Sequence, residues 1–393
     1  MLSRRLEEEV WALDRCAGCG LCVALCAKGM LFWGTDESPI LEKREKALGL
    51  SHTTLDSCSF CPRFCEEGCP RLDEEWRALE PWRVVSVRTR GIIQSGEATE
   101  VIKHLLVAAL SAGLIDGALL NDMDPWRLVP VTRVATTVAE IMDTVGMSSL
   151  WAPTLTALNE AIFEKKLQNL AIVGTPCVSQ ALRKLRGAQN GRLDPYRRAL
   201  RLSIATFCTG VYRPELVKDL LADELDIDVQ QIRRLEARPR EEQLMAVLWD
   251  GSTKAIPLSE VESYTRRGCA RCDDYLGESA DLAVGTLGAR EGFCTLIVRS
   301  QAGEICLRNA LAFGLLEATE EVDHAALRRA SEDKERRKRA QAFDNLMVMM
   351  LDALDEPRKR VEAKQAFVRL YEVKKTAAST GEEANCHVTC AQC

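Results

Sequence analysis

The 393-residue sequence has no apolar run long enough to cross a bilayer, few aromatic residues and no excess of positive charge. Its longest apolar stretch, residues 105–120, is interrupted by Asp116 and is shorter than the ~20 residues that a transmembrane helix needs. Residues 7–9 are glutamates, where a signal peptide would need an apolar segment. The net charge of −6 gives no basic surface for nucleic acid. We therefore expect a cytoplasmic protein with no membrane span and no nucleic-acid partner.

Histidine is also scarce, with four residues, whereas cysteine is abundant, with 17. His52, His104 and His324 have no companion at the spacing of metal ligands, so we expect structural roles for them. In a reducing compartment many cysteines seldom form a disulfide framework, and metal binding is the better interpretation. The arrangement of the cysteines should therefore indicate which metal site they form.

The densest cysteine group is the sequence C-A-G-C-G-L-C-V-A-L-C at residues 16–26. Its Cys-x2-Cys-x2-Cys-x3-Cys spacing is that of bacterial ferredoxins, in which the fourth cysteine binds the neighbouring [4Fe-4S] cluster. A second run, at residues 58–69, has one gap that is longer by one residue and keeps the final Cys-Pro. Exchange of the fourth ligands predicts one cluster on Cys16, Cys19, Cys22 and Cys69, and another on Cys58, Cys61, Cys65 and Cys26.

Zinc is the alternative for these two runs, because four-cysteine sites with two-residue gaps also occur in zinc ribbons. Zinc ribbons, however, place their cysteines in widely separated pairs. Two runs of four cysteines each therefore favour iron–sulfur clusters over zinc.

From residue 81 the sequence alternates short apolar segments with helical ones and contains almost no cysteine. Strands are expected at residues 83–87, 117–121, 170–173, 199–207 and 282–284. Helices are expected at residues 97–112 and 155–166. This alternation predicts a mainly parallel sheet flanked by helices, with ligands bound beyond the carboxyl ends of its strands.

Cysteines follow two of the expected strands. Cys177 ends the segment Gly174-Thr175-Pro176-Cys177, and Cys208 comes directly after the strand at residues 199–207. A third segment carries Cys269 and Cys272 in a Cys-x2-Cys pair. These four cysteines could bind one more [4Fe-4S] cluster, but single cysteines are also common in buried cores. Spacing alone leaves the two alternatives evenly balanced.

The α/β region contains three further motifs: G-T-P-C-V-S-Q-A-L-R-K-L at residues 174–185, T-F-C-T-G at 206–210 and C-A-R-C-D-D-Y-L-G-E-S-A-D-L-A-V-G at 269–285, with a continuation at 288–304. Together they resemble the coenzyme F420 hydrogenase/dehydrogenase beta-subunit family. The resemblance covers roughly residues 83–320 and implies an iron–sulfur flavoprotein that binds FAD. It also implies a third [4Fe-4S] cluster, held by Cys177, Cys208, Cys269 and Cys272.

The resemblance further implies flavin contacts from two segments, which contain Ser95, Gly96 and Thr99, and Gly174, Thr175 and Pro176. The sequence departs from the family at residues 95–97, where Ser-Gly-Glu stands in place of a common Ser-Gly-Gly. It departs again at residues 146–149, where Gly-Met-Ser-Ser replaces Gly-Ser-Lys-Tyr and removes a cation and an aromatic ring. We therefore expect the flavin contacts, and the hydride partner, to differ in detail from those of other members.

Three arginines, Arg266, Arg267 and Arg271, flank the Cys269–Cys272 pair. They are equally compatible with attraction to the charge of a cluster or of flavin phosphates and with a solvated surface. Cys294 and Cys306 stand apart from the cysteine groups and are expected to be core thiols or thiols without a role.

The predicted fold class is α+β for an N-terminal ferredoxin-like domain with two clusters, at residues 1–82, and α/β for an FAD and [4Fe-4S] domain at residues 83–320. A helical extension with a cysteine-rich tail occupies residues 321–393. The apolar group at residues 346–351 is expected to pack on the flavin domain, with docking on another subunit as the alternative. Cys386, Cys390 and Cys393, with His387, could bind zinc or an extra cluster. A site shared with a partner and a disordered tail are the alternatives, and we leave these residues unassigned.

The resemblance implies an oxidoreductase subunit that passes electrons between a hydride carrier, an F420-type deazaflavin, and one-electron partners. FAD and three [4Fe-4S] clusters would carry the electrons, and no acid–base pair of side chains is required. The implied partners are hydrogenase, formate dehydrogenase or heterodisulfide-reductase-like subunits, or ferredoxin. One alternative is an electron-transfer subunit of a larger redox complex with no small-molecule substrate of its own. Another is a stand-alone, ferredoxin-dependent reductase of a pigment-like substrate.

Overall fold

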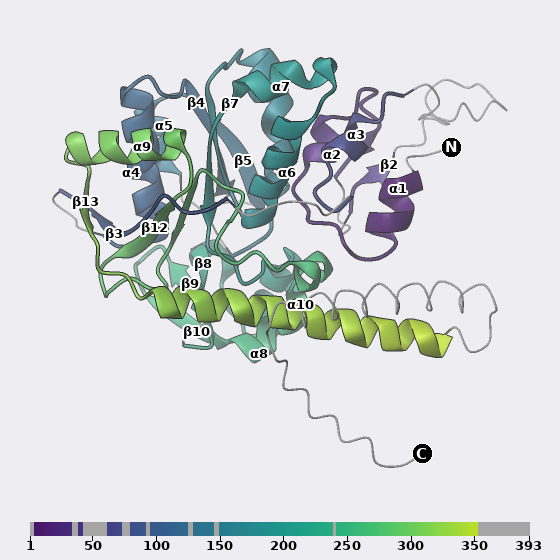
Figure 1. Ribbon diagram of the computed structural model, residues 1–393. Coiled ribbons are helices and arrows are strands. Elements are labelled where there is room, and N and C mark those ends of the chain that lie inside the picture. Colours follow the sequence, from purple (N-terminus) through teal and green to yellow (C-terminus); the bar gives the residue numbers. More distant parts are fainter. Residues whose placement is uncertain are drawn as a thin grey trace, which may run out of the picture. The chain divides into compact units, whose positions relative to one another are not determined.

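The computed structural model describes residues 4–33, 38–41, 61–72, 79–91, 95–124, 129–144, 149–238 and 241–352 (Figure 1). The chain divides into two units, residues 1–335 and 336–393, and the description below concerns the first. Several predicted features lie outside the described residues: Cys58, residues 146–148, and the tail cysteines Cys386, Cys390 and Cys393. The side chains at residues 346–351 also lie outside the description.

An eight-stranded sheet forms the centre of the first unit (Figure 1). Its strands, in spatial order, are β13 (Leu316–Thr319), β3 (Arg83–Thr89), β12 (Cys294–Val298), β11 (Leu282–Gly285), β7 (Leu200–Thr206), β6 (Leu170–Gly174), β4 (Gly117–Met123) and β5 (Pro130–Ala135). Strands β4, β6, β7 and β11 are parallel to one another. Strands β5, β12, β3 and β13 join through antiparallel pairs.

All five expected strands are present, as β3, β4, β6, β7 and β11, but the prediction of a mainly parallel sheet is wrong, because four of the seven neighbouring strand pairs are antiparallel. The reason lies in the connections. Residues 286–293 between β11 and β12, and residues 124–129 between β4 and β5, are too few for the crossover of a dozen or more residues that parallel pairing requires. Both connections therefore return the chain antiparallel.

Helices cover both faces of this sheet. One face carries α4 (Ala98–Ser111), α5 (Val138–Asp143) and α9 (Gln301–Ala312). The other carries α6 (Pro176–Gly187), α7 (Asp194–Ala199) and two short segments, η3 (Thr154–Ala157) and η4 (Glu160–Glu164). The expected helix at residues 97–112 is confirmed as α4. The helix expected at 155–166 is instead a 3-10 turn followed by a π-helical turn, because apolar periodicity reports the buried face and not the winding of the backbone.

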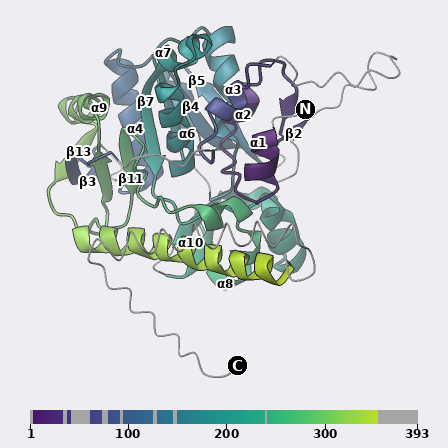
Figure 2. The same cartoon turned by 45° about the vertical axis from the view of Figure 1, so that its right-hand side comes forward.

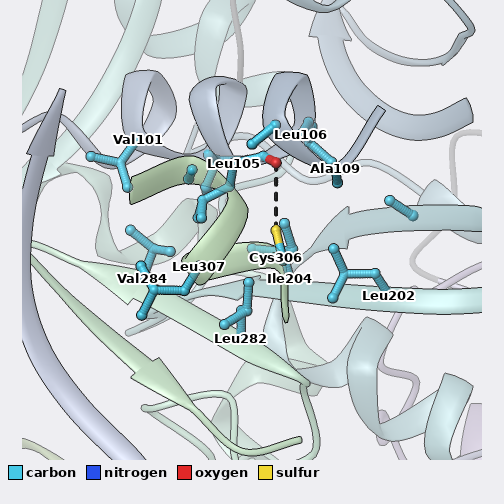
Figure 3. Packing of buried hydrophobic residues seen from close by; sticks show 14 of the residues in the cluster. Val101, Leu105, Leu106, Ala109, Leu202, Ile204, Leu282, Val284, Cys306 and Leu307 are labelled. Atoms are coloured by element: carbon cyan, nitrogen blue, oxygen red, sulfur yellow. Dashed lines mark hydrogen bonds between the residues drawn. The ribbon is translucent and has the colours of Figure 1, made fainter. Parts of the chain in front are cut away.

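Apolar residues explain the position of the central elements. All five residues of β6 are buried, as in a strand covered on both faces. Figure 3 shows the layer between the sheet and helices α4 and α9, where Leu105 and Leu106 of α4 pack over Ile204 of β7. Cys306 of α9 lies in this layer and donates a hydrogen bond to the carbonyl oxygen of Leu105 (3.4 Å). Cys306 is therefore the core thiol that the sequence predicts.

The described residues of the N-terminal region form few regular elements. They are α1 (Arg4–Leu6), η1 (Glu7–Trp11), α2 (Leu21–Ala24), β1 (Leu31–Phe32), β2 (Ile40–Leu41) and α3 (Phe64–Glu67). Leu21 and Leu25 belong to the same buried cluster as Val178 and Leu182 of α6, so α2 lies on the α6 face of the sheet (Figure 2). The N-terminal region therefore shares a core with the α/β region.

The sequence analysis did not find a second, antiparallel sheet of three strands, β8 (Ile232–Arg238), β9 (Gln243–Leu248) and β10 (Thr253–Pro257). It has its own buried core with the π-helical segment η6 (Leu216–Glu224). The remaining short segments are η5 (Gly191–Leu193), η7 (Val229–Gln231), α8 (Leu258–Val261), η8 (Glu262–Tyr264) and η9 (Arg267–Arg271), and the long helix α10 spans His324–Asp352. Within the described residues no helix is both long and apolar enough to span a membrane.

Candidate functional site: two cysteine-lined cavities

The first cavity, here called the N-terminal cavity, is lined by Cys16, Cys19, Cys22 and Cys69. The first two lie in the loop before α2, Cys22 lies in α2, and Cys69 follows α3. Gly18 and Gly20 have positive φ (+69° and +88°), which lets the loop turn sharply enough to bring its cysteines to one side. The structure thus brings together the four cysteines that ligand exchange between the two runs predicts for one cluster.

Three of the four cysteines predicted for the other N-terminal cluster are described. Cys26 and Cys61 are half-buried and Cys65, in α3, is buried. The Sγ of Cys26 accepts a hydrogen bond from the backbone N–H of Met30 (3.3 Å). Because Cys58 lies outside the described residues, the second ligand set stays a prediction from spacing.

The second cavity, here called the central cavity, is lined by Cys177, Cys208, Cys269 and Cys272. Cys177 is in the first turn of α6, Cys208 follows β7, and Cys269 and Cys272 lie in and directly after η9. Strands β6 and β7 are parallel neighbours, so their carboxyl ends open on the same edge of the sheet. The fold therefore gathers four cysteines from three loops that are distant in the sequence.

The two cavities are neighbours, because Ala17 and Gly18 line both of them. The thiol of Cys177 in the central cavity donates a hydrogen bond to the carbonyl oxygen of Ala17 (3.5 Å). On the other side of the loop, a Cβ atom built on Gly268 would lie 2.0 Å from the carbonyl oxygen of Cys16. One loop of the N-terminal region therefore separates the two cysteine sets, and it fits against η9 only because residue 268 has no side chain.

Burial makes these thiols weak acids when no metal is bound. It raises the pKa of Cys16 to about 11, of Cys269 to about 11 and of Cys208 to about 12. Since a cysteine binds metal as the thiolate, the charge of bound iron would have to offset this burial. Among the described residues no three His, Cys, Asp or Glu side chains are close enough to hold a single ion. In a cubane, by contrast, each thiolate binds a different iron atom at its own corner.

Arg266 supplies a buried positive charge beside the N-terminal cavity. Its side chain is 2% exposed, and its guanidinium lies 4.0 Å from the ring centroid of Trp151 and 5.9 Å from that of Trp33. Its charge opposes the effect of burial on the pKa of Cys16. Arg267, in contrast, is exposed and pairs with Asp14 (3.4 Å). The two arginines, equivalent in the sequence, therefore have different surroundings.

Lys334 of α10 supplies a second buried positive charge, at the central cavity, and the sequence analysis missed it. Its side chain is 3% exposed, and its Nζ donates hydrogen bonds to the carbonyl oxygens of Cys208 (2.5 Å) and Asp274 (2.8 Å). Burial acts to lower the pKa of Lys334, but the charges of the cavity cysteines raise it above its usual value. No sequence signal distinguishes Lys334 from its neighbours in the charged run E-D-K-E-R-R-K-R.

The flavin contacts expected near the first helix lie at the carboxyl end of β3. The backbone N–H of Ser95 donates to Oγ1 of Thr89 (2.8 Å), and Ser95 Oγ accepts from the N–H of Glu97 (3.1 Å). A Cβ on Gly96 would lie 2.3 Å from the carbonyl carbon of Gly292, so this position requires glycine. Cys294, expected as a core thiol, is buried and donates to the carbonyl oxygen of Gly96 (2.5 Å).

Thr99 lies in the first turn of α4, and Glu97, the residue before that helix, makes no side-chain cap. The second expected flavin segment, Gly174 to Pro176, joins β6 to α6, and Thr175 and Pro176 line the central cavity. Strands β3 and β6 lie four positions apart in the sheet, which corresponds to about 19 Å at ~4.8 Å per strand. The two segments therefore occupy the same edge of the sheet at separate places.

Comparison with known proteins agrees with the family resemblance of the sequence motifs. Residues 84–159 match the N-terminal part, and residues 167–324 the C-terminal part, of the coenzyme F420 hydrogenase/dehydrogenase beta subunit. An uncharacterized protein of Methanocaldococcus jannaschii is 32% identical over 358 residues, which are 85% of this chain and 97% of that protein. The coenzyme F420-dependent sulfite reductase of the same organism is 28% identical over 340 residues, 82% of this chain but only 50% of the reductase.

A solved structure shows the same fold. A chain of the F420-reducing [NiFe] hydrogenase complex from Methanosarcina barkeri superposes with a TM-score of 0.61 at 22% identity, over 68% of this chain and 93% of that chain. The sequence matches place the chain among the oxidoreductases. It belongs to the coenzyme F420 hydrogenase/dehydrogenase beta-subunit family, as its motifs predict, and this family carries FAD and iron–sulfur clusters.

Proposed function

We propose that the chain is an F420-linked electron-transfer oxidoreductase subunit that connects a hydride carrier to one-electron partners through FAD and three [4Fe-4S] clusters. The observation that carries this proposal is the contact between the two cysteine-lined cavities, which share Ala17 and Gly18. Adjacent cluster sites of this kind would let single electrons pass between the N-terminal and α/β regions. The division into domains at residues 1–82, 83–320 and 321–393 is part of the same proposal.

The cysteines fit [4Fe-4S] clusters in number and in chemistry. Each cavity presents four thiols, the full complement that a cubane requires, and the described thiols of both sets are buried or half-buried. The central cluster would be held by Cys177, Cys208, Cys269 and Cys272, and the first N-terminal cluster by Cys16, Cys19, Cys22 and Cys69. The third would use Cys26, Cys61 and Cys65 together with Cys58. A bound cluster would supply one-electron storage at each place.

The carboxyl edge of the sheet fits a dinucleotide such as FAD. Helices α4 and α6 both begin there without a side-chain cap from the preceding residue, and N–H groups in such a first turn attract phosphate oxygens. Ser95, Gly96 and Thr99 would contact one part of the flavin, and Gly174, Thr175 and Pro176 the part next to the central cavity. Bound FAD would supply the exchange between two-electron hydride transfer and one-electron transfer.

The protein itself contributes burial and charge. Arg266 and Lys334 place positive charge beside cavities that would hold negatively charged clusters. The indole N–H of Trp151 donates to the carbonyl oxygen of Gly18 (2.9 Å) and fixes the loop between the cavities. The backbone N–H of Leu155 donates to the carbonyl oxygen of Cys19 (2.9 Å) and holds the same loop from the other side. These contacts join the loop between the two sites to the α/β region.

Related proteins support F420 as the hydride carrier and other redox subunits as partners. Relatives include a subunit of F420H2 dehydrogenase from Methanosarcina mazei and the beta subunit of an F420-dependent formate dehydrogenase from Methanococcus maripaludis. Both are components of multisubunit enzymes by name, which also favours the second candidate, an electron-transfer subunit with no small-molecule substrate of its own. Ferredoxin and heterodisulfide-reductase-like subunits remain further candidate partners.

Rapid mixing of the anaerobically purified chain with reduced F420, NADH and NADPH in turn tests this proposal. We expect the flavin absorbance to bleach with reduced F420, and the cluster absorbance to fall afterwards. Bleaching only with NADH or NADPH would show that a nicotinamide, and not F420, is the hydride carrier. Failure with all three donors would favour the electron-transfer subunit without its own substrate. Absence of bound flavin and iron would overturn both candidates.

A further inference from the structure

Lys334 differs in burial from the charged residues around it on α10. Residues 332, 333, 335 and 336, on either side of it, are all exposed, as is Arg328 one and a half turns earlier. Lys334 alone of this group is buried, and it lines the central cavity together with the four cysteines. A lysine in a solvated charged helix would normally extend into water, because burial of an ammonium without compensating charge is costly.

The hydrogen bonds of Lys334 do not by themselves compensate this cost. Its two acceptors, the carbonyl oxygens of Cys208 and Asp274, are uncharged backbone groups. The nearby carboxylate of Asp274 accepts hydrogen bonds from Nε2 of Gln180 (3.1 Å) and from the backbone N–H of Glu278 (3.0 Å). The charge of Asp274 compensates part of the burial of Lys334. The cysteines of the central cavity, as thiolates, are the other negative groups that act on Lys334.

A [4Fe-4S] cluster on the four cysteines would carry this negative charge. Four thiolates outweigh the positive charge of the iron–sulfide core, so the site has a net negative charge that increases by one when the cluster accepts an electron. A fixed positive charge at the cavity wall therefore stabilises the reduced cluster more than the oxidised one. Charge near a cluster and its hydrogen bonding are recognised determinants of cluster potential.

We propose that Lys334 is a positioning residue of the central site that raises the reduction potential of the cluster held by Cys177, Cys208, Cys269 and Cys272. Its two carbonyl contacts also tie the loops after β7 and after η9 to α10. The inference rests on the proposed function, since it requires a cluster at that site. On reduction the site gains one electron and Lys334 keeps its proton, so no co-reactant is needed.

The test is an anaerobic redox titration, followed by electron paramagnetic resonance, of the full-length chain and the variant Lys334→Met. The signal of the central cluster is identified as the one that disappears in Cys272→Ser. We expect Lys334→Met to make this cluster harder to reduce, with at least a tenfold lower ratio of reduced to oxidised cluster at a fixed potential. Tenfold corresponds to about 59 mV for one electron. Lys334→Arg keeps the positive charge, so its central cluster should stay close to the wild-type reduction potential.

Controls separate charge from structure. Arg328→Gln removes a positive charge from an exposed position of the same helix and should leave the potential of the central cluster at its wild-type value. If Lys334→Met loses the iron of this site, Lys334→Gln, which still donates hydrogen bonds, is titrated instead. Loss of iron from the Met and Gln variants but not from Lys334→Arg would also support a charge requirement.

Two outcomes would overturn the inference. One is a central cluster with wild-type potential in Lys334→Met or in its Gln replacement. The other is loss of that cluster from the Met, Gln and Arg variants alike, which would make Lys334 a purely structural contact. A different result, wild-type iron content in Cys272→Ser, would show that no cluster is bound at the central site. That result would contradict the proposed function and is distinct from a failure of the Lys334 assignment.

Discussion

The N-terminal cavity and the central cavity collect their cysteines in different ways. Three of the four cysteines of the N-terminal cavity come from residues 16–22, a single loop and the helix α2. The central cavity takes its cysteines from loops after β6, after β7 and around η9, separated by dozens of residues. A local loop brings its cysteines together by itself, whereas the edge of a sheet has to be assembled before its cysteines meet.

The cations beside the two cavities also differ in the contacts that hold them. Arg266 stacks on Trp151 and Trp33, so its position depends on aromatic side chains from both regions of the chain. Lys334 is held by two backbone carbonyl oxygens, and it lies on α10, more than sixty residues after Cys272, the nearest cavity cysteine in sequence. The comparison teaches that the charge environment of each site is a tertiary property even where the ligands are local.

The largest effect should come from separate removal of one ligand from each cavity. Wild-type chain should contain about twelve iron atoms, because three cubanes contain four each. We expect Cys19→Ser and Cys272→Ser each to lose about four of them, since serine is seldom ionised near neutral pH and is a poor ligand for this cluster. Iron and acid-labile sulfide analysis of anaerobic samples measures this.

Cys306→Ser is the matched control, because Cys306 is buried in the core and lies in neither cavity. Its iron content should equal that of the wild type. Loss of eight or more irons from either ligand variant would show that the two sites do not assemble independently. Two zinc atoms in place of iron would refute the cluster assignment for the N-terminal runs.

The contact between the cavities should be broken by Gly268→Ala. The added Cβ would lie 2.0 Å from the carbonyl oxygen of Cys16, so the loop between the cavities has to move. We expect a loss of about 3 kcal/mol in the free energy of unfolding, at the upper end of overpacking costs. Anaerobic denaturant unfolding measures it. Gly187→Ala is the control, because nothing lies within 4 Å of a Cβ there. Equal stabilities of the two variants would contradict the close approach of η9 to Cys16.

Ionisation of Glu278 should make the free energy of unfolding depend on pH. Burial, assisted by the charge of Asp274, raises the pKa of Glu278 from 4.5 to about 7. The folded state therefore binds this proton more tightly than the unfolded state, and stability falls as pH rises from about 4.5 to about 7. Glu278→Gln should reduce the difference in unfolding free energy between pH 5 and pH 8 by about 1–2 kcal/mol, after a discount for the partial exposure of this side chain.

Denaturant unfolding at both pH values, with Glu332→Gln as an exposed carboxylate control on α10, measures the effect. The control should show the wild-type difference between pH 5 and pH 8. A wild-type difference in Glu278→Gln as well would show that another group controls the pH dependence.

The smallest expected effect concerns the loop contact made by Trp151. Trp151→Phe keeps an aromatic ring for Arg266 but removes the indole N–H that donates to the carbonyl oxygen of Gly18 (2.9 Å). We expect a loss of about 1 kcal/mol in unfolding free energy, the usual net value of one hydrogen bond. Trp249→Phe, at a 56% exposed position, should change stability by less than about 0.5 kcal/mol. Equal effects of the two variants would remove Trp151 as a support of the shared loop.

The sequence by itself determined the local features of this protein. Five strands of the central sheet were predictable because each is a short apolar run bounded by polar or glycine-rich residues, and α4 because its apolar residues recur at helical spacing. The gathering of Cys16, Cys19 and Cys22 at one cavity was predictable, because consecutive turns fix their spacing. The family was recognisable from motifs that surround Cys177, Cys208 and Cys269.

Only the tertiary structure decided what lies between these local features. The antiparallel strands β5 and β12 follow from connection lengths, and the sheet β8–β10 from pairings that no period in the sequence revealed. The contact of Cys177 with Ala17, the glycine at residue 268 and the burial of Lys334 all join segments far apart in the chain. Sequence patterns predict the local structure of residues that are close together along the chain. Packing and long-range electrostatics depend instead on which distant segments come into contact.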